Sequence, residues 1–437
     1  MVNFGELSGT DQGLDIYEKS IMVKSDADYL KIAIAILVVA FALRVMWCAV
    51  IPVIPMSDPK AYDLLARTLA DYGVYGWSVD RLSAYWPPGT SAMYAALYRT
   101  FGQSYNPVAI VNVILSTGIV GLTMWLGWRL FDAQTGLFAG LLMAIWPSEV
   151  LYVTILASEL PFTVFVLLGC VAWFNLRLPN LLRAIASGLA FGAASYFRPV
   201  ALLLPIVLWL SSLPNWRKLR DDLPLALIAI IIVGVVVAPW SVRNTKVFGH
   251  FVGMSTADGV NLWVGNNANS DGYYMPIPAW TEGLGEYEQD RRLGQEARRF
   301  ILDNPSTFIL RGIKKAVLLH LNETIAVTWN TEGITDRFGE NALFPLKLVT
   351  RGFWTGVLLF ALGGIAILMR SRGVLASLVN PIVLIWAYYT AVYSVFFVTD
   401  RYHFPAHPFI AMLASVTILT CVKLTPLARA DEKLLNR

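Results

Sequence analysis

Runs of about 20 apolar residues recur along almost the whole chain, and they constrain the fold more than any other feature. A run of this length, wound as an α-helix, spans the roughly 30 Å hydrocarbon core of a bilayer. Only 15% of the 437 residues are charged, whereas soluble domains carry about a quarter. An ordinary soluble enzyme is therefore excluded, and the sequence predicts an all-α polytopic integral membrane protein.

The apolar runs predict about ten transmembrane helices. We place them at 30–53, 107–130, 136–153, 158–176, 183–197, 199–213, 224–242, 346–369, 375–397 and 404–423. This divides the chain into an N-terminal segment 1–29, a transmembrane domain 30–423 and a tail 424–437. The first segment mixes acidic and basic residues, unlike a signal peptide, so the first span is expected to remain as an anchor.

The loop charges predict the orientation of these spans. With the N-terminus in the cytoplasm, every segment assigned to the cytoplasm carries Lys or Arg, as the positive-inside rule requires. Both termini are then cytoplasmic, and two long segments, 54–106 and 243–345, face outward. Their amphipathic stretches, after Pro59 and around 286–303 and 306–321, are expected to form interfacial helices.

Asp58 is the residue that most clearly suggests chemistry. It lies just past the first span, at the start of a long polar segment. A solvated carboxylate at the membrane surface can act as a general base and take the proton of an acceptor hydroxyl. Asp58 also precedes Pro59, which fits a helix N-terminal cap. The residues alone leave both interpretations open.

Three arginines, Arg198, Arg243 and Arg401, map to the outer ends of predicted spans. A single arginine there commonly anchors a helix by extending to the headgroups. Three together suggest a cationic site, because the guanidinium fork matches phosphate oxygens. His403 could share that role or be an interfacial histidine, and Lys60 could bind an acidic donor or lie on a solvated helix face.

Two further ionisable groups lie in or at the ends of apolar spans, where exposure to lipid is unfavourable. Glu159 could orient a sugar or pair with an arginine, and Arg44, which lies deeper, is expected to brace the helices. Asn261 and Asn266 could donate hydrogen bonds to sugar hydroxyls, although Asn and Gly clusters also form ordinary turns.

The order of short motifs resembles the GT-C superfamily of glycosyltransferases that use polyprenyl-phosphate sugars, in particular its protein O-mannosyltransferase and aminoarabinose-transferase branch. The matching motifs are Asp58-Pro-Lys-Ala-Tyr62, Trp86-Pro-Pro-Gly89, Ala157-Ser-Glu159, Phe197-Arg198-Pro199, Pro239-Trp240-Ser-Val-Arg243-Asn244, Gly259-Val-Asn261, Gly265-Asn266-Asn267 and Arg401-Tyr402-His403-Phe404-Pro405. One departure is Asp58-Pro59, where mannosyltransferases of this branch usually have an Asp-Glu pair.

The resemblance implies an inverting hexosyl- or pentosyltransferase of the inner membrane. It would move a sugar from a polyprenyl-monophosphate donor to a lipid, glycan or protein acceptor at the extracytoplasmic face. Asp58 would be the catalytic base; Arg198, Arg243, Arg401, His403 and Lys60 would bind the donor phosphate; and Glu159, Tyr62, Asn261 and Asn266 would contact sugar or acceptor. No general acid is needed, because a polyprenyl phosphate leaves as a stable anion, unlike the leaving group of a glycosidase.

The sequence predicts neither a cofactor nor a nucleic-acid partner. The nearest acidic neighbour of Asp58 is Asp63, so no metal-binding pair is evident there, and a divalent metal is possible but not supported. The three cysteines all lie in apolar spans, without metal-ligand spacing. No cationic run interleaved with aromatic residues suggests nucleic acid. The predicted partners are the donor, its acceptor and the lipid bilayer.

Two alternatives remain open from the residues. A glycan ligase or polymerase that uses a lipid-diphosphate donor would favour a denser arginine cluster and a catalytic histidine. A lipid or sugar transporter predicts short loops and internal repeats with helices broken at mid-membrane. The long outer segments and the acidic residues near the surface argue against a transporter.

Overall fold

The computed structural model describes residues 26–424, and this part of the chain is helical, without a β-strand. The predicted all-α fold is therefore confirmed. Residues 1–25 and 425–437 lie outside the described part, so almost all of the predicted N-terminal segment 1–29 and tail 424–437 falls there.

Each predicted apolar span is helical, but the helices differ in length. Five are long and apolar enough to cross a membrane, with η5 included in the last: α2 (Asp26–Val50), α5 (Asn106–Leu130), α11 (Trp216–Phe248), α17 (Leu343–Arg372) and α20 (His407–Leu424), which follows the 3₁₀ segment η5 (Asp400–Ala406). A sixth span results if α6 (Ala133–Ile145) is counted with α7 (Pro147–Leu151) and η1 (Tyr152–Thr154), which bend by 56°.

The remaining apolar helices of the described chain are shorter. They are α8 (Glu159–Phe174), α9 (Asn180–Ser195), η2 (Pro199–Leu203) with α10 (Leu204–Leu210), α18 (Val374–Leu378) and α19 (Pro381–Val395). The predicted turn at Arg198-Pro199 is confirmed, because Arg198 has an extended backbone (φ −148°, ψ 125°) between α9 and η2. Proline disfavours a helical conformation in the residue before it, which explains the break.

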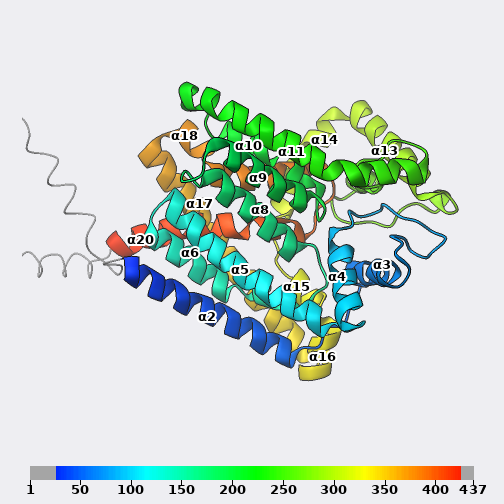
Figure 1. Cartoon of the computed structure of the whole chain (residues 1–437), viewed down its shortest axis with the longest axis horizontal. Coiled ribbons are helices and arrows are strands. Elements are labelled where there is room, and N and C mark those ends of the chain that lie inside the picture. The colour runs from blue at the N-terminus through cyan, green and yellow to red at the C-terminus, as the bar shows by residue number, and fades with distance from the viewer. Residues whose placement is uncertain (1–25, 425–437) are drawn as a thin grey trace, which may run out of the picture.

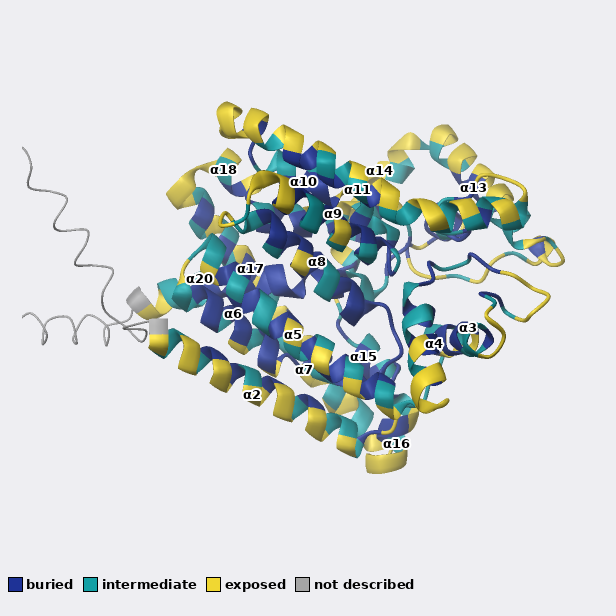
Figure 2. Cartoon of the chain, viewed as in Figure 1, coloured by how far each residue is buried: buried dark blue, intermediate teal, exposed yellow. Residues whose placement is uncertain are grey.

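Large apolar side chains on the outside of the helix bundle show that the protein is an integral membrane protein. On α2, Leu30, Val38 and Met46 are each about 60% exposed, and Ile231 and Val235 on α11 are similar. Figure 2 shows such exposed residues along the outward faces of these helices. Exposed apolar surface of this extent is unfavourable in water and favourable against lipid.

Arg44 lies inside this apolar bundle and is fully buried. Its guanidinium donates hydrogen bonds to Ser116 Oγ (2.6 Å) and to the carbonyl oxygens of Ala144 (3.0 Å) and Met143 (3.1 Å). The bonds join α2 to α5 and α6, so the predicted bracing role is confirmed.

The two predicted outer segments lie at the same end of the bundle, opposite the start of α2 and the end of α20 (Figure 1). Segment 54–106 contains α3 (Asp58–Tyr72) and α4 (Gly89–Phe101). Segment 243–345 contains α12 (Asp258–Gly265), η3 (Ala279–Thr281), α13 (Glu286–Asp303), α14 (Pro305–Leu318), α15 (Ile325–Thr328), α16 (Thr331–Phe338) and η4 (Glu340–Ala342). The helices expected at 286–303 and 306–321 correspond to α13 and α14.

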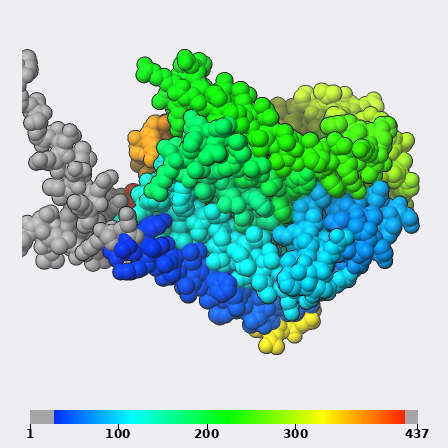
Figure 3. Space-filling view, viewed as in Figure 1, coloured from blue at the N-terminus to red at the C-terminus, as the bar shows by residue number. Residues whose placement is uncertain are grey.

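Polar contacts fasten the two segments together. Glu286, in the first turn of α13, accepts hydrogen bonds from Ala84 N (2.7 Å) and Ser83 Oγ (2.8 Å). Arg243 donates to the carbonyl oxygens of Ser83 (2.6 Å) and Tyr75 (2.9 Å). In the space-filling view the first segment lies against the yellow-green part of the second segment (Figure 3). These contacts join the two segments at the end of the bundle.

Candidate active site

Asp58 is the first residue of α3, and its carboxylate turns away from the helix backbone. The residue before it, Ser57, has a positive φ of 55° and makes no side-chain cap hydrogen bond. Asp58 Oδ2 instead accepts a hydrogen bond from Arg401 Nη2 at 2.5 Å. The helix-cap interpretation of Asp58 is therefore wrong, because a guanidinium makes a stronger, charge-assisted bond than the amide of a helix end.

Arg401 is one member of a chain of four charges. Its Nη1 lies 3.9 Å from Glu159 Oε1, and the same oxygen accepts a hydrogen bond from Arg198 Nη2 at 2.5 Å. Asp58, Arg401, Glu159 and Arg198 thus alternate in sign and together carry no net charge, and we call them the charge chain. One of the two predicted roles of Glu159, pairing with an arginine, is confirmed.

The charge chain is assembled from four elements that are remote in sequence. Asp58 begins α3, Glu159 begins α8, Arg198 precedes η2 and Arg401 lies in η5. The Trp86-Pro-Pro-Gly89 motif brings α4 to the same place, because Gly89 N donates to the carbonyl oxygen of Tyr196 at 2.8 Å. A Cβ at Gly89 would lie 2.6 Å from that oxygen, so glycine is required for the close approach.

Aromatic rings hold the two guanidinium groups in place. The Arg401 guanidinium lies 4.8 Å from the Trp329 ring centre and 5.3 Å from that of Tyr402, and Arg198 lies 5.6 Å from Tyr402. Tyr402 in turn stacks on Tyr393 at 4.4 Å. Cation–π contacts of this kind stabilise a charge without neutralising it. Both arginines are therefore preorganised, and an anion that enters the pocket would compete with Asp58 and Glu159 for them.

A pocket of about 490 Å³ opens beside the charge chain. Arg198 and Arg401 line it together with the predicted site residues Tyr62 and Asn261. Most of the remaining wall is apolar or aromatic, formed by Trp86, Phe197, Val200, Leu203, Tyr388, Phe396 and others. The pocket thus has a cationic part and a larger apolar part, as a site for an amphiphilic anion would have.

Of the ten predicted site residues, six do not line this pocket: Asp58 and Glu159 contact its two arginines from behind, and the remaining four have other partners or are exposed. The Arg243 guanidinium is held by the carbonyl oxygens of Ser83 and Tyr75 and lies over the Trp240 ring at 4.7 Å. Lys60 is exposed on α3. The buried Asn266 amide donates to the carbonyl oxygens of Leu262 and Val395. His403 is also buried and stacks on Trp354 at 4.1 Å. Arg243 and Asn266 thus link structural elements.

Asp258 is a residue at the pocket that the sequence analysis missed. It begins α12 and lies three residues before Asn261, so its place beside the quoted Gly259-Val-Asn261 motif was a usable signal. Although its side chain reaches solvent, enclosure by the pocket walls raises the pKa of this carboxyl to about 6, and Asp290 adds to the increase. Asp258 also lines a neighbouring cavity of about 370 Å³ with Asp290, Arg291 and Arg298.

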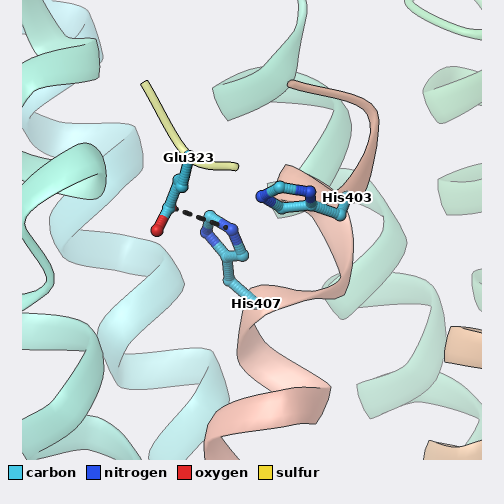
Figure 4. Close-up of side chains that lie close together, drawn as sticks. All are labelled: Glu323, His403 and His407. Carbon is cyan, nitrogen blue, oxygen red and sulfur yellow. Dashed lines mark ion pairs between the residues drawn. The ribbon is translucent and has the colours of Figure 1, made fainter. Parts of the chain in front are cut away.

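The described chain also contains a group of side chains that could hold a metal ion. Glu323, His403 and His407 each offer one ligand atom, and these atoms lie within 4.8 Å of one another (Figure 4). The sequence analysis placed His403 at the donor phosphate and did not consider Glu323 or His407. The spacing of His403 and His407, four residues apart, was a usable signal.

Comparison with known proteins identifies the fold. Residues 86–242 match the model of the dolichyl-phosphate-mannose-protein mannosyltransferase family. The oligosaccharyltransferase of Archaeoglobus fulgidus in the apo form is similar in structure, with a TM-score of 0.55 at 11% identity over 93% of this chain and 52% of that chain. The same archaeal enzyme, AglB, in complex with an inhibitory peptide and a dolichol-phosphate, gives a TM-score of 0.52 at 11% identity with the same coverage.

ArnT from Cupriavidus metallidurans in the apo state aligns with a TM-score of 0.41 at 18% identity, over 88% of this chain and 77% of that chain. No curated protein matches the chain. The chain spans about half the length of the archaeal enzyme. It has the fold of the GT-C glycosyltransferases, as its motifs predicted.

Proposed function

We propose that this protein is an inverting glycosyltransferase that moves a sugar from a polyprenyl-monophosphate donor to a hydroxyl group of a lipid, glycan or protein. One observation carries the proposal: two arginines held by aromatic rings line a mostly apolar pocket, and one of them, Arg401, is paired with the Asp58 carboxylate just behind the pocket wall. The apolar wall suits a prenyl chain, and the guanidinium forks suit a phosphate. The GT-C fold and the dolichol-phosphate bound to the archaeal oligosaccharyltransferase support the same assignment.

The ion pair between Asp58 and Arg401 suggests how the proposed catalytic base, Asp58, is coupled to the proposed phosphate-binding residue, Arg401. A polyprenyl-phosphate sugar is a phosphodiester with one negative charge, and its phosphate competes with Asp58 for Arg401. The acceptor oxygen forms a bond to the anomeric carbon, and the bond between that carbon and the phosphate oxygen breaks. The electron pair leaves with the phosphate, and Asp58 takes the acceptor proton.

Protonation of Asp58 then weakens its attraction to Arg401. At the same moment the leaving phosphate gains a second negative charge, which Arg401 is free to stabilise. Before the reaction the charge chain carries no net charge. When one proton moves to Asp58, the Arg401 guanidinium therefore exchanges the carboxylate for the phosphate as its main partner. Arg198, held by Glu159 through a 2.5 Å bond, remains a fixed second contact.

The other predicted residues have subordinate roles in this proposal. Tyr62 and Asn261 line the pocket and would contact the sugar or acceptor. The cavity shared by Asp258 and Asp290 offers the acceptor an approach beside the donor. The positive-inside distribution of Lys and Arg supports an extracytoplasmic position for the pocket in this proposal.

The test is turnover of purified protein in lipid nanodiscs with a panel of polyprenyl-phosphate sugars, in which released polyprenyl phosphate and the anomeric configuration of the product are measured. Asp58→Asn should lower the rate about 10²–10⁴-fold, because an amide cannot accept the proton. Asp71→Asn, which changes an exposed carboxylate on the same helix, is the matched control. Full turnover by Asp58→Asn, or use of diphosphate donors alone, would contradict the proposal.

A further inference from the structure

The group Glu323, His403 and His407, here called the histidine cluster, lies wholly inside the protein. The exposed fractions of these residues are 2%, 1% and 0%. Glu323 lies in the connection between α14 and α15, His403 in η5, and His407 at the start of α20. Figure 4 shows the three side chains pointing toward one another from these separate segments.

Contacts on the outer side of the two imidazoles favour a proton on Nδ1 of each ring. His403 Nδ1 lies 2.7 Å from the carbonyl oxygen of Leu319, and a carbonyl oxygen can only accept. His407 Nδ1 lies 3.0 Å from Glu149 Oε1. In His403 the proton is therefore on Nδ1. In His407 the same tautomer follows when Glu149 is ionised, and both Nε2 lone pairs then point into the cluster.

The lone pairs that meet in the cluster have no donor. His403 Nε2 and His407 Nε2 are both buried without a hydrogen-bond partner. Glu323 Oε2 is buried too, and only the Ser148 hydroxyl, which makes no well-formed hydrogen bond of its own, interacts with this carboxylate among the neighbouring hydroxyls of the described chain. Glu323 Oε1 lies 3.2 Å from His407 Nε2, but it already accepts a hydrogen bond from Trp146 Nε1 at 2.8 Å. Buried acceptors left unpaired are destabilising, and acceptors that converge on one point favour a positive centre between them.

We propose that Glu323, His403 and His407 bind a divalent transition-metal ion of the zinc type. Two imidazole nitrogens and a carboxylate oxygen are a ligand set that Zn²⁺ accepts. Metal-binding histidines almost always donate their other N–H to a carboxylate or a backbone carbonyl, and Glu149 and Leu319 supply one of each. The two positive charges of the ion match the two buried carboxylates of Glu149 and Glu323.

The position of the ion suggests a structural role. It joins η5 and α20 to the connection before α15, and Asp400 Oδ2 reinforces the same junction by accepting hydrogen bonds from Thr324 N (2.7 Å) and Ile325 N (3.1 Å). Arg401 lies in this segment, two residues before His403. The ion would therefore hold the segment that presents Arg401 to the pocket. This inference does not depend on the reaction proposed above.

A proton is the competing explanation. Burial raises the pKa of Glu323 well above its usual value, so its carboxyl group could be neutral and donate a hydrogen bond to His407 Nε2. A proton would leave His403 Nε2 unpaired, whereas a metal ion satisfies all three groups. The two explanations predict different metal contents.

Metal content separates them directly. Protein purified without chelators and incubated with Zn²⁺, then freed of unbound ion, should contain about one zinc per chain by inductively coupled plasma mass spectrometry. Glu323→Gln preserves the size and the Trp146 contact but removes the charge, and it should lose the ion. His250→Gln, which changes an exposed histidine outside the cluster, is the matched control and should retain it.

A second measurement guards against variants that do not fold. Wild-type protein reloaded with Co²⁺ should show the visible absorption bands of a four- or five-coordinate nitrogen and oxygen site, and Zn²⁺ should displace them. Zinc should also raise the melting temperature of the wild type but not of Glu323→Gln. Wild-type protein without bound zinc and without a cobalt spectrum, or equal metal content in wild type and Glu323→Gln, would overturn the inference. None of these readouts requires glycosyl transfer.

Discussion

The charge chain at the pocket and the buried histidine cluster are built partly from the same short segment, yet they differ in how their polar groups are satisfied. In the charge chain, each carboxylate already faces a guanidinium, so a ligand must compete for a partner. In the histidine cluster, the acceptors face one another, so a partner must be added. The first arrangement suits exchange during a reaction cycle, and the second suits a permanent ion.

The backbone of η5 explains how one segment serves both. A 3₁₀ helix turns by about 120° per residue, so Arg401 and His403, two residues apart, face different directions. His403 and His407 are four residues apart across the junction with α20, which brings them to one side. The segment Arg401–His407 thus contributes to both sites within two turns: Arg401 belongs to the charge chain, where partners exchange, and the two histidines belong to the buried cluster.

The largest expected effect on this comparison comes from Arg401. Arg401→Ala removes the partner of Asp58 and a phosphate contact together, and it should lower kcat/KM about 10²–10³-fold, as loss of a charge-stabilising donor does. Arg401→Lys should recover only part, because a point charge cannot reproduce the fork. Steady-state kinetics on folded protein would measure this, with Arg299→Ala on the exposed side of α13 as a control. Unchanged kcat/KM in Arg401→Ala would show that the phosphate is held elsewhere.

A double substitution sharpens the claim that Asp58 and Arg401 exchange partners. If the two residues act as one unit, the double variant Asp58→Asn with Arg401→Ala should have nearly the same kcat/KM as the slower of the two single variants. The difference should stay within about threefold. Independent action would instead multiply the two losses. The comparison of kcat/KM among the four proteins therefore separates a coupled pair from two unrelated contributions.

The position of Arg243 predicts a smaller effect of a different kind. Arg243→Ala should leave the KM for the donor unchanged, because the guanidinium does not line the pocket. It should lower the free energy of unfolding by roughly 1.5–3 kcal/mol, because two charged hydrogen bonds between the outer segments are lost. Thermal melting in detergent together with donor titration would test both. A raised KM without a change in melting temperature would restore Arg243 as a phosphate ligand.

The predictions from sequence succeeded where a pattern along the chain determines the structure. Apolar runs located the helices, and the Arg198-Pro199 pair located a turn. The direction in which a side chain points from a loop depends on tertiary packing. For this reason Arg243 and His403, although in recognised motifs, were assigned to a pocket that they do not line.

Glu323 shows the limit of sequence analysis most clearly. In the sequence it is one acidic residue in a long outer segment, with no metal-ligand motif around it. Its role becomes evident only because folding brings it to His407, 84 residues further along the chain, and buries both. A pairing of this kind follows from the packing of helices that are separated in sequence, and local sequence patterns do not predict that packing.

The smallest expected effect concerns pH and Asp258, whose carboxyl has a pKa raised to about 6. Above this pH the group is ionised and repels an anionic donor at the pocket. As the pH falls through 6 the charge is lost, so the KM for the donor should decrease severalfold. Asp258→Asn should bind the donor equally well across this range, without the inflection.

The free energy of unfolding should also depend on the protonation of Asp258. Because the folded state holds the Asp258 proton more tightly than the unfolded state does, stability should rise as the pH falls from above 6 towards 4. Donor titrations and melting curves between pH 5 and pH 8, compared with those of Asp258→Asn, would test the assignment. An inflection near pH 6 that persists in Asp258→Asn would assign the titration to another group. Its absence from the variant would make Asp258 a pH-dependent member of a site whose other charges are already paired.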